Sequence, residues 1–559
     1  MATDQREGKS DILSRPPKLG AEASAAMAGT LLVAVLLALT AMYAGPLWRD
    51  EANTANAANL PSVRELWQAE SFPPLWTLLL RASERLGLVS GDAGIRMVGL
   101  YVGLLFLAAL WLATRWMGCR GPVFSVALLG CLPAFIFTVG SNRAYGLACV
   151  FLIFSFGAIW RMLEKPSGAR VFWAGFASLL FVHCVYFDVL LLAAMLAGGG
   201  VVVLRRREWK TLGILTALGV ISVASLAAYP SLFHRSANNA QLFEYPSVPW
   251  SLLWNVLRDA VTARSSAEFG RNGPEIWLWL ALLLAGVAAA FAVQRRGGDE
   301  QAVQRRADLA IFCVTTLLLG VPGMFVFLQR LHYLPQAWYF MELLCLCAIA
   351  TDGLLGASWP ALRPWGMIRI GFMIAVMAWG VKSAWSEGHT RRSNLDLMAT
   401  ALTQSASGRD LIVVPVWEGI TFNRYYHGQT RWMTVPPIES HLMHRSDLVQ
   451  EKMNAELNGQ EPMAPVLQAI TNVLQSNGTV WLIGGVSAQG SKPAAGSNAW
   501  LGIYLSYWKG MISTCLMGNA VQQQVLDLRV DAPLCYLEKP ALLRFSGYKT
   551  STNNPVAAP

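Results

Sequence analysis

The chain has 559 residues, of which 54% are hydrophobic and only 14% are charged. Soluble domains carry about 25% charged residues, so this composition excludes an ordinary soluble protein and favours a membrane protein. The net charge of +10 does not indicate a nucleic-acid partner, because the Lys and Arg residues stand mostly between hydrophobic runs, where membrane topology explains them.

Eleven hydrophobic runs predict membrane-spanning helices, each of which needs about 20 mostly apolar residues. The stretch over 171–204 is broken near His183, Tyr186 and Asp188. Two short helices with a tight turn are therefore favoured there over one long helix, which remains the alternative. The predicted spans are 25–45, 95–114, 122–141, 144–160, 171–186, 188–204, 211–230, 276–294, 309–328, 337–356 and 366–384.

The distribution of positive charge predicts how these helices are oriented. Cytoplasmic segments of membrane proteins are enriched in Lys and Arg. With the N-terminus inside, the inner segments before residue 385 hold 19 Lys and Arg, and the longer outer segments hold 10. We predict a multi-pass inner-membrane protein with a cytoplasmic segment at 1–24, an uncleaved signal anchor as its first span, and outer loops at 46–94 and 231–275.

The tail over 385–559 is predicted to be a periplasmic α/β domain that follows the membrane region over 25–384. Strand-like runs occur at Leu411–Val416 and Val480–Ile483. The first run is followed by Trp-Glu-Gly-Ile-Thr-Phe-Asn-Arg-Tyr-Tyr, which is typical of a strand leading into a helix.

Cys515 and Cys535 are the only two of the nine cysteines that lie in this tail. If the tail is periplasmic, it lies in an oxidising compartment. The sequence therefore predicts a disulfide between them, and two buried free thiols are the alternative.

Candidate catalytic residues follow the first span directly, where Asp50 and Glu51 are adjacent. Acidic side chains at the lip of a span are costly to place against hydrocarbon. A carboxylate at this depth can act as the general base towards an attacking hydroxyl or amine. From the pair alone, a solvated acidic cap of a short helix remains the alternative.

The first loop continues with Glu70-Ser-Phe-Pro-Pro-Leu and an amphipathic run. Together with the acidic pair and the number of spans, this pattern resembles the GT-C glycosyltransferases, in the branch of the protein O-mannosyltransferases, the lipid A aminoarabinose transferases and the Rgt-type lipopolysaccharide transferases. The resemblance covers roughly 25–384. It implies inverting transfer of a sugar from a polyprenyl-phosphate carrier to a lipid, glycan or protein acceptor, with Asp50 as the base and Glu51 as its partner.

The resemblance also implies where the donor and its carrier bind. Ser-Asn-Arg143-Ala-Tyr145 resembles the Arg-x-Tyr element of the family, and a guanidinium offers two parallel donors to a phosphate. A snorkelling interfacial Arg is the alternative for Arg143, and a structural role is the alternative for His183. The predicted donor- and carrier-binding residues are Arg143, Tyr145, His183, Tyr186, Asp188, Arg330 and His332.

Three further residues fit the same picture with less force. Glu70 and Arg424 are candidate acceptor contacts, with a surface helix as the alternative for Arg424. Glu342 lies within a predicted span and is expected to face the protein interior.

Several motifs are absent from the sequence. There is no Walker loop, HExxH, zinc-binding Cys/His spacing or D-x-D element. The sequence requires no cofactor, and a divalent metal remains open because the family includes metal-dependent and metal-independent members. The alternative functions are a flippase or transporter of lipid-linked sugars, for which repeat symmetry is expected, and an O-antigen polymerase or ligase.

Overall fold

A computed structural model describes residues 20–70, 72–229, 248–262, 273–293, 300–331, 335–356, 363–487, 501–526, 528, 533–535 and 538–549. Most of the predicted segment 1–24, most of the predicted loop 231–275 and His332 lie outside these residues.

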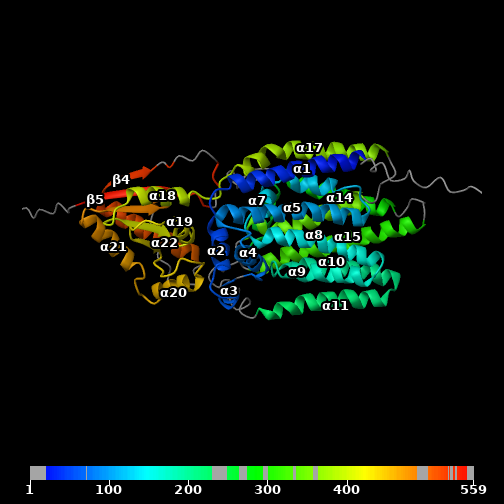
Figure 1. The fold of residues 1–559 in the computed structure, drawn as a ribbon, viewed down its shortest axis with the longest axis horizontal. Helices are drawn as coiled ribbons and strands as arrows, with labels where there is room; N and C mark the ends of the chain where they lie inside the picture. Colours follow the sequence, from blue (N-terminus) through cyan, green and yellow to red (C-terminus); the bar gives the residue numbers. More distant parts are fainter. Residues whose placement is uncertain are drawn as a thin grey trace, which may run out of the picture.

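Long apolar helices run side by side and form a bundle, and a smaller α/β body lies at one end of it (Figure 1). Eight helical segments among the described residues are long and apolar enough to cross a membrane, so the chain is a multi-pass membrane protein. They consist of α1 (Ala21–Tyr43), α5 (Gly91–Met117), α8 (Ala144–Glu164), α10 (Asp188–Arg206), α11 (Trp209–Ser225) with η1 (Leu226–Ala228), α15 (Glu300–Arg330), α16 (Met341–Thr351) between η3 (Ala337–Phe340) and η4 (Asp352–Gly356), and α17 (Arg363–Gly388).

The other predicted spans are shorter or broken helices, so the count of eleven remains a prediction. The prediction of one continuous helix over 122–141 is wrong, because the structure has α6 (Val123–Gly130) and α7 (Pro133–Val139) there. Pro133 begins α7, and a proline disfavours helical backbone in the residue before it. The predicted break within 171–204 is confirmed: α9 (Gly168–Val182) ends before α10 begins. The remaining predicted span corresponds to α14 (Glu275–Val293).

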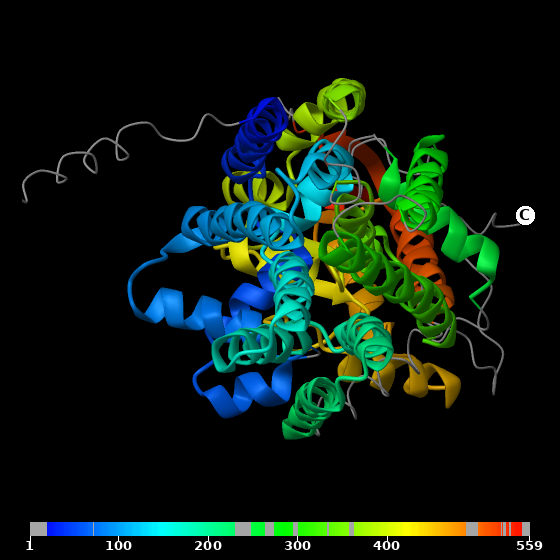
Figure 2. The same cartoon turned by 90° about the vertical axis from the view of Figure 1, so that its right-hand side faces the viewer.

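Within the bundle, α5 packs against α8, α10 against α15, and α1 against α17. Figure 2 shows these helices nearly end-on. Short helices of the first predicted outer loop lie at the end of the bundle that faces the α/β body (Figure 1). They are α2 (Arg49–Ala58), α3 (Val63–Ala69) and α4 (Leu75–Arg85), and α13 (Trp250–Val261) belongs to the second such loop.

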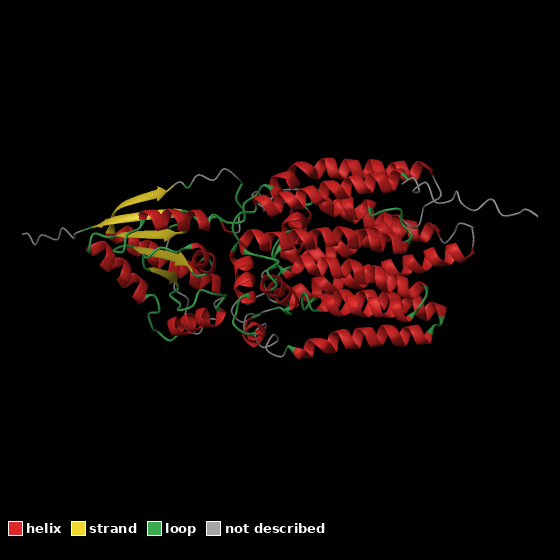
Figure 3. Cartoon of the chain, in the orientation of Figure 1, coloured by secondary structure: helices red, strands yellow, loops and turns green. Residues whose placement is uncertain are grey.

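The α/β body contains a five-stranded sheet in the order β2-β1-β3-β5-β4, drawn in yellow in Figure 3. The strands β2, β1 and β3 are parallel to one another, and β5 is antiparallel to both β3 and β4. The strands are β1 (Leu411–Pro415), β2 (Trp432–Val435), β3 (Thr479–Ile483), β4 (Ala520–Leu526) and β5 (Leu542–Tyr548), and the helices are α18 (Leu395–Ser405), α19 (Gly419–Tyr425), α20 (Ser446–Leu457), α21 (Ala464–Gln475) and α22 (Leu501–Asn519).

Both faces of β1 are buried, which explains why this strand reads as a continuous apolar run. Successive side chains of a strand point to opposite faces. Leu411 and Val413 pack in a cluster with α20, α21 and α22. Ile412 and Val414 pack in another cluster with α18 and α19. The predicted strands at both runs, and the helix after the first, are confirmed.

The predicted disulfide between Cys515 and Cys535 is wrong, because the structure has no disulfide between these two described residues. They belong to different parts of the molecule. Cys515 lies on α22 beside Thr471 of α21, whereas Cys535 is buried against Trp48 and Phe137 at the end of the bundle. Sequence spacing does not determine whether two Cβ atoms come close enough to be bridged.

Candidate active site

The site begins at the first turn of α2, where the two adjacent carboxylates have different surroundings. Glu51 is completely buried, and its carboxylate accepts a hydrogen bond from the Trp48 N–H at 3.4 Å. The side chain of Asp50 is 20% exposed. Acidic side chains in the first turn of a helix are favoured by the helix dipole, and successive side chains diverge by about 100°.

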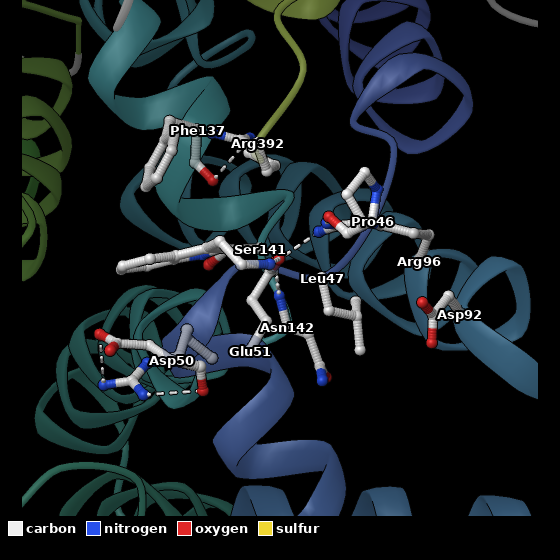
Figure 4. A network of polar contacts seen from close by, with 12 residues as sticks. Pro46, Leu47, Asp50, Glu51, Asp92, Arg96, Phe137, Ser141, Asn142 and Arg392 are labelled. Carbon is white, nitrogen blue, oxygen red and sulfur yellow. Dashed lines mark hydrogen bonds and ion pairs between the residues drawn. The ribbon is translucent and has the colours of Figure 1, made fainter. Parts of the chain in front are cut away.

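Glu51 joins three separate segments (Figure 4). Its Oε1 forms an ion pair with Arg96 of α5 and accepts a hydrogen bond from the Asn142 N–H at 2.8 Å. Arg96 also donates to the carbonyl oxygen of Pro46 at 2.7 Å. A buried carboxylate that is paired and hydrogen-bonded holds its partners in one geometry, so this network positions α2 relative to the turn before α8.

That turn carries Arg143, which lies beside Asp50. The Arg143 Nη2 is 3.7 Å from the Asp50 Oδ2, and Arg143 Nη1 donates to the Asp50 carbonyl oxygen at 3.2 Å. The His444 Nε2 lies 3.3 Å from the Asp50 Oδ1, and Arg49 Nε lies 3.8 Å from the same oxygen. The predicted Asp50 and Arg143 are thus in contact.

The environment of Asp50 determines its charge. Burial raises the pKa of Asp50, but Arg143, the hydrogen bond and charge of His444, and Arg49 together outweigh burial. The resulting pKa lies well below the usual range of an aspartate, so Asp50 is ionised at physiological pH.

Aromatic rings surround the Arg143 guanidinium. Its Cζ lies 5.9 Å from the ring centroid of Phe72 and 5.8 Å from that of Tyr145. Phe72 stacks on Tyr186, with centroids 5.8 Å apart. The Pro-Pro-Leu segment and the turns before α8 and α10 therefore converge, which brings Arg143, Tyr145 and Tyr186 together as neighbours of one cluster.

Other predicted residues have different surroundings. Both ring nitrogens of His183 are in contact, with the hydroxyls of Ser225 at 2.9 Å and Tyr229 at 2.8 Å, which ties α9 to the end of α11. Arg330 is exposed at the last residue of α15. Glu70 accepts a hydrogen bond from the Thr77 hydroxyl at 2.6 Å.

Asp188 at the start of α10 and Glu342 in α16 are both completely buried. Arg424 forms an ion pair with Asp92 of α5 at 2.6 Å and donates to the Asn56 side-chain oxygen at 3.1 Å. It therefore lies where the C-terminal body contacts the bundle.

Sequence reasoning missed Arg96, Phe72 and His444. Phe72 lies inside the predicted Pro-Pro-Leu segment and could have been named from it. Arg96 lies at the start of a predicted span, where a basic residue usually indicates only an interfacial position. His444 is 394 residues from Asp50 and belongs to no motif, so no sequence signal pointed to it.

The described residues contain no group of three or more His, Cys, Asp or Glu side chains arranged to hold a metal ion.

The solved structures that are similar to this chain include two of ArnT from Cupriavidus metallidurans, one bound to undecaprenyl phosphate and one in the apo state. Both are 14% identical to this chain. The match to the first structure covers 81% of this chain and 92% of the ArnT chain, with a TM-score of 0.39. The match to the second structure covers 82% of this chain and 93% of the ArnT chain, with a TM-score of 0.36. No protein-family model matches the chain, and none of the curated proteins matches it.

Proposed function

We propose that this protein is an inverting glycosyltransferase that moves a sugar from a polyprenyl-phosphate donor to an acceptor hydroxyl. The observation that supports this most is the contact between Asp50 and Arg143 at the end of a membrane bundle. A carboxylate for proton removal and a guanidinium for phosphate binding lie side by side there. Both side chains are partly exposed, at 20% and 15%, so substrates can reach them.

The reaction assigns one task to each group. Arg143 presents two parallel donors to the phosphate of the donor. The acceptor oxygen attacks the anomeric carbon from the opposite side, which inverts its configuration. The bond between that carbon and the phosphate oxygen breaks, and its electron pair leaves with the polyprenyl phosphate, whose charge Arg143 stabilises. Asp50 takes the proton of the acceptor hydroxyl.

The surroundings of the pair support these tasks. The partly exposed rings of Phe72 and Tyr186 provide apolar surface near Arg143, which suits a sugar ring or the first isoprene units of the carrier. Glu51 is buried in its pair with Arg96. In this proposal it orients α2 so that Asp50 stays accessible, and it does not bind the acceptor.

The replacement Asp50→Asn tests the proposal, because an amide has nearly the same shape as the carboxylate but cannot take the proton. A positioned general base contributes about 10²–10⁴-fold in rate, so we expect a loss of that size in sugar transfer. Undecaprenyl phosphate should still bind, since Arg143 is unchanged.

The matched control is Asp447→Asn, in which the altered carboxylate is 64% exposed and pairs with Arg445. This variant should transfer at the wild-type rate. An Asp50→Asn protein that transfers sugar nearly as fast as the wild type would show that the base is another residue.

A further inference from the structure

A loop of the C-terminal body lies against one face of α2. Its contacts are made by Asp50, Asn53 and Asn56, which are spaced three residues apart and therefore share a face of the helix. Asn56 Nδ2 donates to the carbonyl oxygen of Leu442 at 2.7 Å, and the His444 N–H donates to Asn53 Oδ1 at 2.8 Å. The imidazole of His444 completes the row with Asp50.

The backbone contacts hold this loop without help from the His444 ring. Asn56 uses both ends of its amide, since its oxygen accepts from Arg424 while its nitrogen donates to Leu442. Arg424 and Tyr425 both bind Asp92 at the start of α5. Replacing the His444 ring should therefore leave the C-terminal body docked on the bundle.

The His444 ring lies beside the Asp50 carboxylate. Its Nε2 lies 3.3 Å from the Asp50 Oδ1, and the side chain is 28% exposed. The ring packs edge-on against Trp417, with ring centroids 5.6 Å apart. Arg143 lies nearer the other oxygen, Oδ2, at 3.7 Å. A phosphate that binds Arg143 would draw the guanidinium away from Oδ2 and leave His444 as the main support of Asp50.

We infer that His444 is a positioning residue of the active site: its ring N–H holds Oδ1 of Asp50, so that Oδ2 stays directed at the acceptor after Arg143 binds the donor phosphate. The C-terminal body thus completes the active site. This inference rests on the proposed function. It is also consistent with the low pKa of Asp50, to which the hydrogen bond and charge of His444 contribute. The charged or titratable groups that face Asp50 are Arg49, Arg143 and His444.

Two substitutions separate the hydrogen bond from the packing. His444→Gln keeps an N–H donor near the position of Nε2 but removes the ring. His444→Phe keeps a ring against Trp417 but has no donor. We expect His444→Phe to lose about tenfold to a hundredfold in kcat, as for a lost hydrogen bond to a charged group, with little change in KM for the donor. His444→Gln should retain most of the activity.

The pH profile gives a second readout that a structural role would not change. Without the His444 donor, the pKa of Asp50 rises, so the ionised base is lost at a higher pH as the solution is acidified. The acidic limb of the activity profile should therefore move to higher pH in His444→Phe and much less in His444→Gln. The control is His441→Gln in the same loop: the His441 ring packs at a tilt against Trp432, with ring centroids 4.4 Å apart, and this variant should keep the wild-type profile.

The measurement is the release of undecaprenyl phosphate by full-length protein in lipid vesicles. The probes are undecaprenyl-phosphate-linked glucose, mannose, galactose and 4-aminoarabinose, with an envelope extract as the source of acceptors. If His444→Phe is as active as the wild type, or if Phe preserves activity and Gln does not, His444 acts by packing or not at all, and the inference is overturned. If wild-type protein releases no undecaprenyl phosphate from any probe, the proposed function itself is overturned, and the inference with it.

Discussion

Asp50 and Glu51 are adjacent, yet their carboxylates have opposite surroundings because a helix turns by about 100° per residue. Glu51 points into the protein and binds Arg96, whereas Asp50 points towards the C-terminal body and remains partly exposed. An acidic pair at this position can therefore provide one structural carboxylate and one reactive carboxylate. At the residue scale, the direction in which each carboxylate points decides its role, because both residues are acidic.

The two arginines that were predicted to bind the donor phosphate also differ in their surroundings. Arg143 contacts Asp50 and two aromatic rings, whereas Arg330 is exposed at the end of α15. We predict that Arg143→Lys weakens the binding of undecaprenyl phosphate by about tenfold or more, because an ammonium lacks the two-pronged geometry. The Arg330→Ala protein should bind undecaprenyl phosphate as tightly as the wild type does. Equal Kd values for wild type and Arg143→Lys in a vesicle titration would remove Arg143 from the phosphate site.

Glu538 provides a test of stability against pH. It is buried, accepts hydrogen bonds from the Thr421 hydroxyl at 2.9 Å and the Arg49 N–H at 3.3 Å, and burial raises its pKa from 4.5 to about 8. The folded state therefore binds the proton more tightly than the unfolded state. The resulting stabilisation is complete below about pH 4.5 and is lost as the pH rises to about 8.

Glu538→Gln is neutral at every pH and should avoid this loss. We expect its Tm to match the wild type near pH 5 and to exceed it at pH 8, as followed by circular dichroism. Glu439→Gln, at an exposed position, should retain the wild-type pH dependence. A Glu538→Gln protein whose Tm falls as steeply as that of the wild type between the two pH values would contradict the assignment.

At the scale of elements, α2 is the piece on which the site is assembled. Its buried side binds α5 through Arg96, and its exposed side binds the C-terminal loop through Asn53 and Asn56. The turn before α8 is held in the same network by the Asn142 N–H. A shift of α5 relative to this turn should therefore reach Asp50 and Arg143 directly.

Gly99 of α5 allows that shift to be tested. A Cβ at Gly99 would lie 2.9 Å from the carbonyl oxygen of Gly140, just before the turn that carries Arg143. We predict that Gly99→Ala lowers stability by about 1–3 kcal/mol, as overpacking usually does, and lowers transfer activity as well.

Gly213→Ala on α11 is the matched control, because a Cβ there meets no atom within 4 Å. It should be neutral or stabilising by up to about 1 kcal/mol, since alanine favours a helix over glycine. Thermal unfolding of both variants in detergent checks the pair. An unchanged Tm and activity in Gly99→Ala would show that the contact with Gly140 adapts without cost.

At the scale of the whole molecule, a membrane bundle and an α/β body meet at α2, and the candidate site lies at their junction (Figure 1). In the proposed reaction, the donor anchored in the bilayer and the acceptor would meet at this junction. The side of the membrane on which the C-terminal body lies therefore decides on which side the proposed reaction takes place.

We predict that this body lies outside the cytoplasm, because the eleven predicted spans and the accumulation of positive charge in the predicted inner segments would place the two ends of the chain on opposite sides. An alkaline phosphatase reporter fused after residue 559 should be active. The same reporter fused after Glu208, in a predicted inner segment, should be inactive. The reverse pattern would contradict the predicted orientation.

The sequence by itself determined that this is a membrane protein, since long apolar runs have few stable alternatives to helices within a bilayer. It also determined β1 and β3, because strands buried on both faces leave continuous apolar runs. Asp50 and Arg143 could be proposed from local patterns and a family resemblance.

Only the tertiary structure decided which of the candidate residues meet. The separation of Cys515 from Cys535 and the contact of His444 with Asp50 both depend on long-range packing. Hydrophobic periodicity reports the burial of a segment but not its neighbours. A hydrogen bond that joins residues 394 positions apart leaves no local pattern, because it forms only when the bundle and the C-terminal body have both folded and docked.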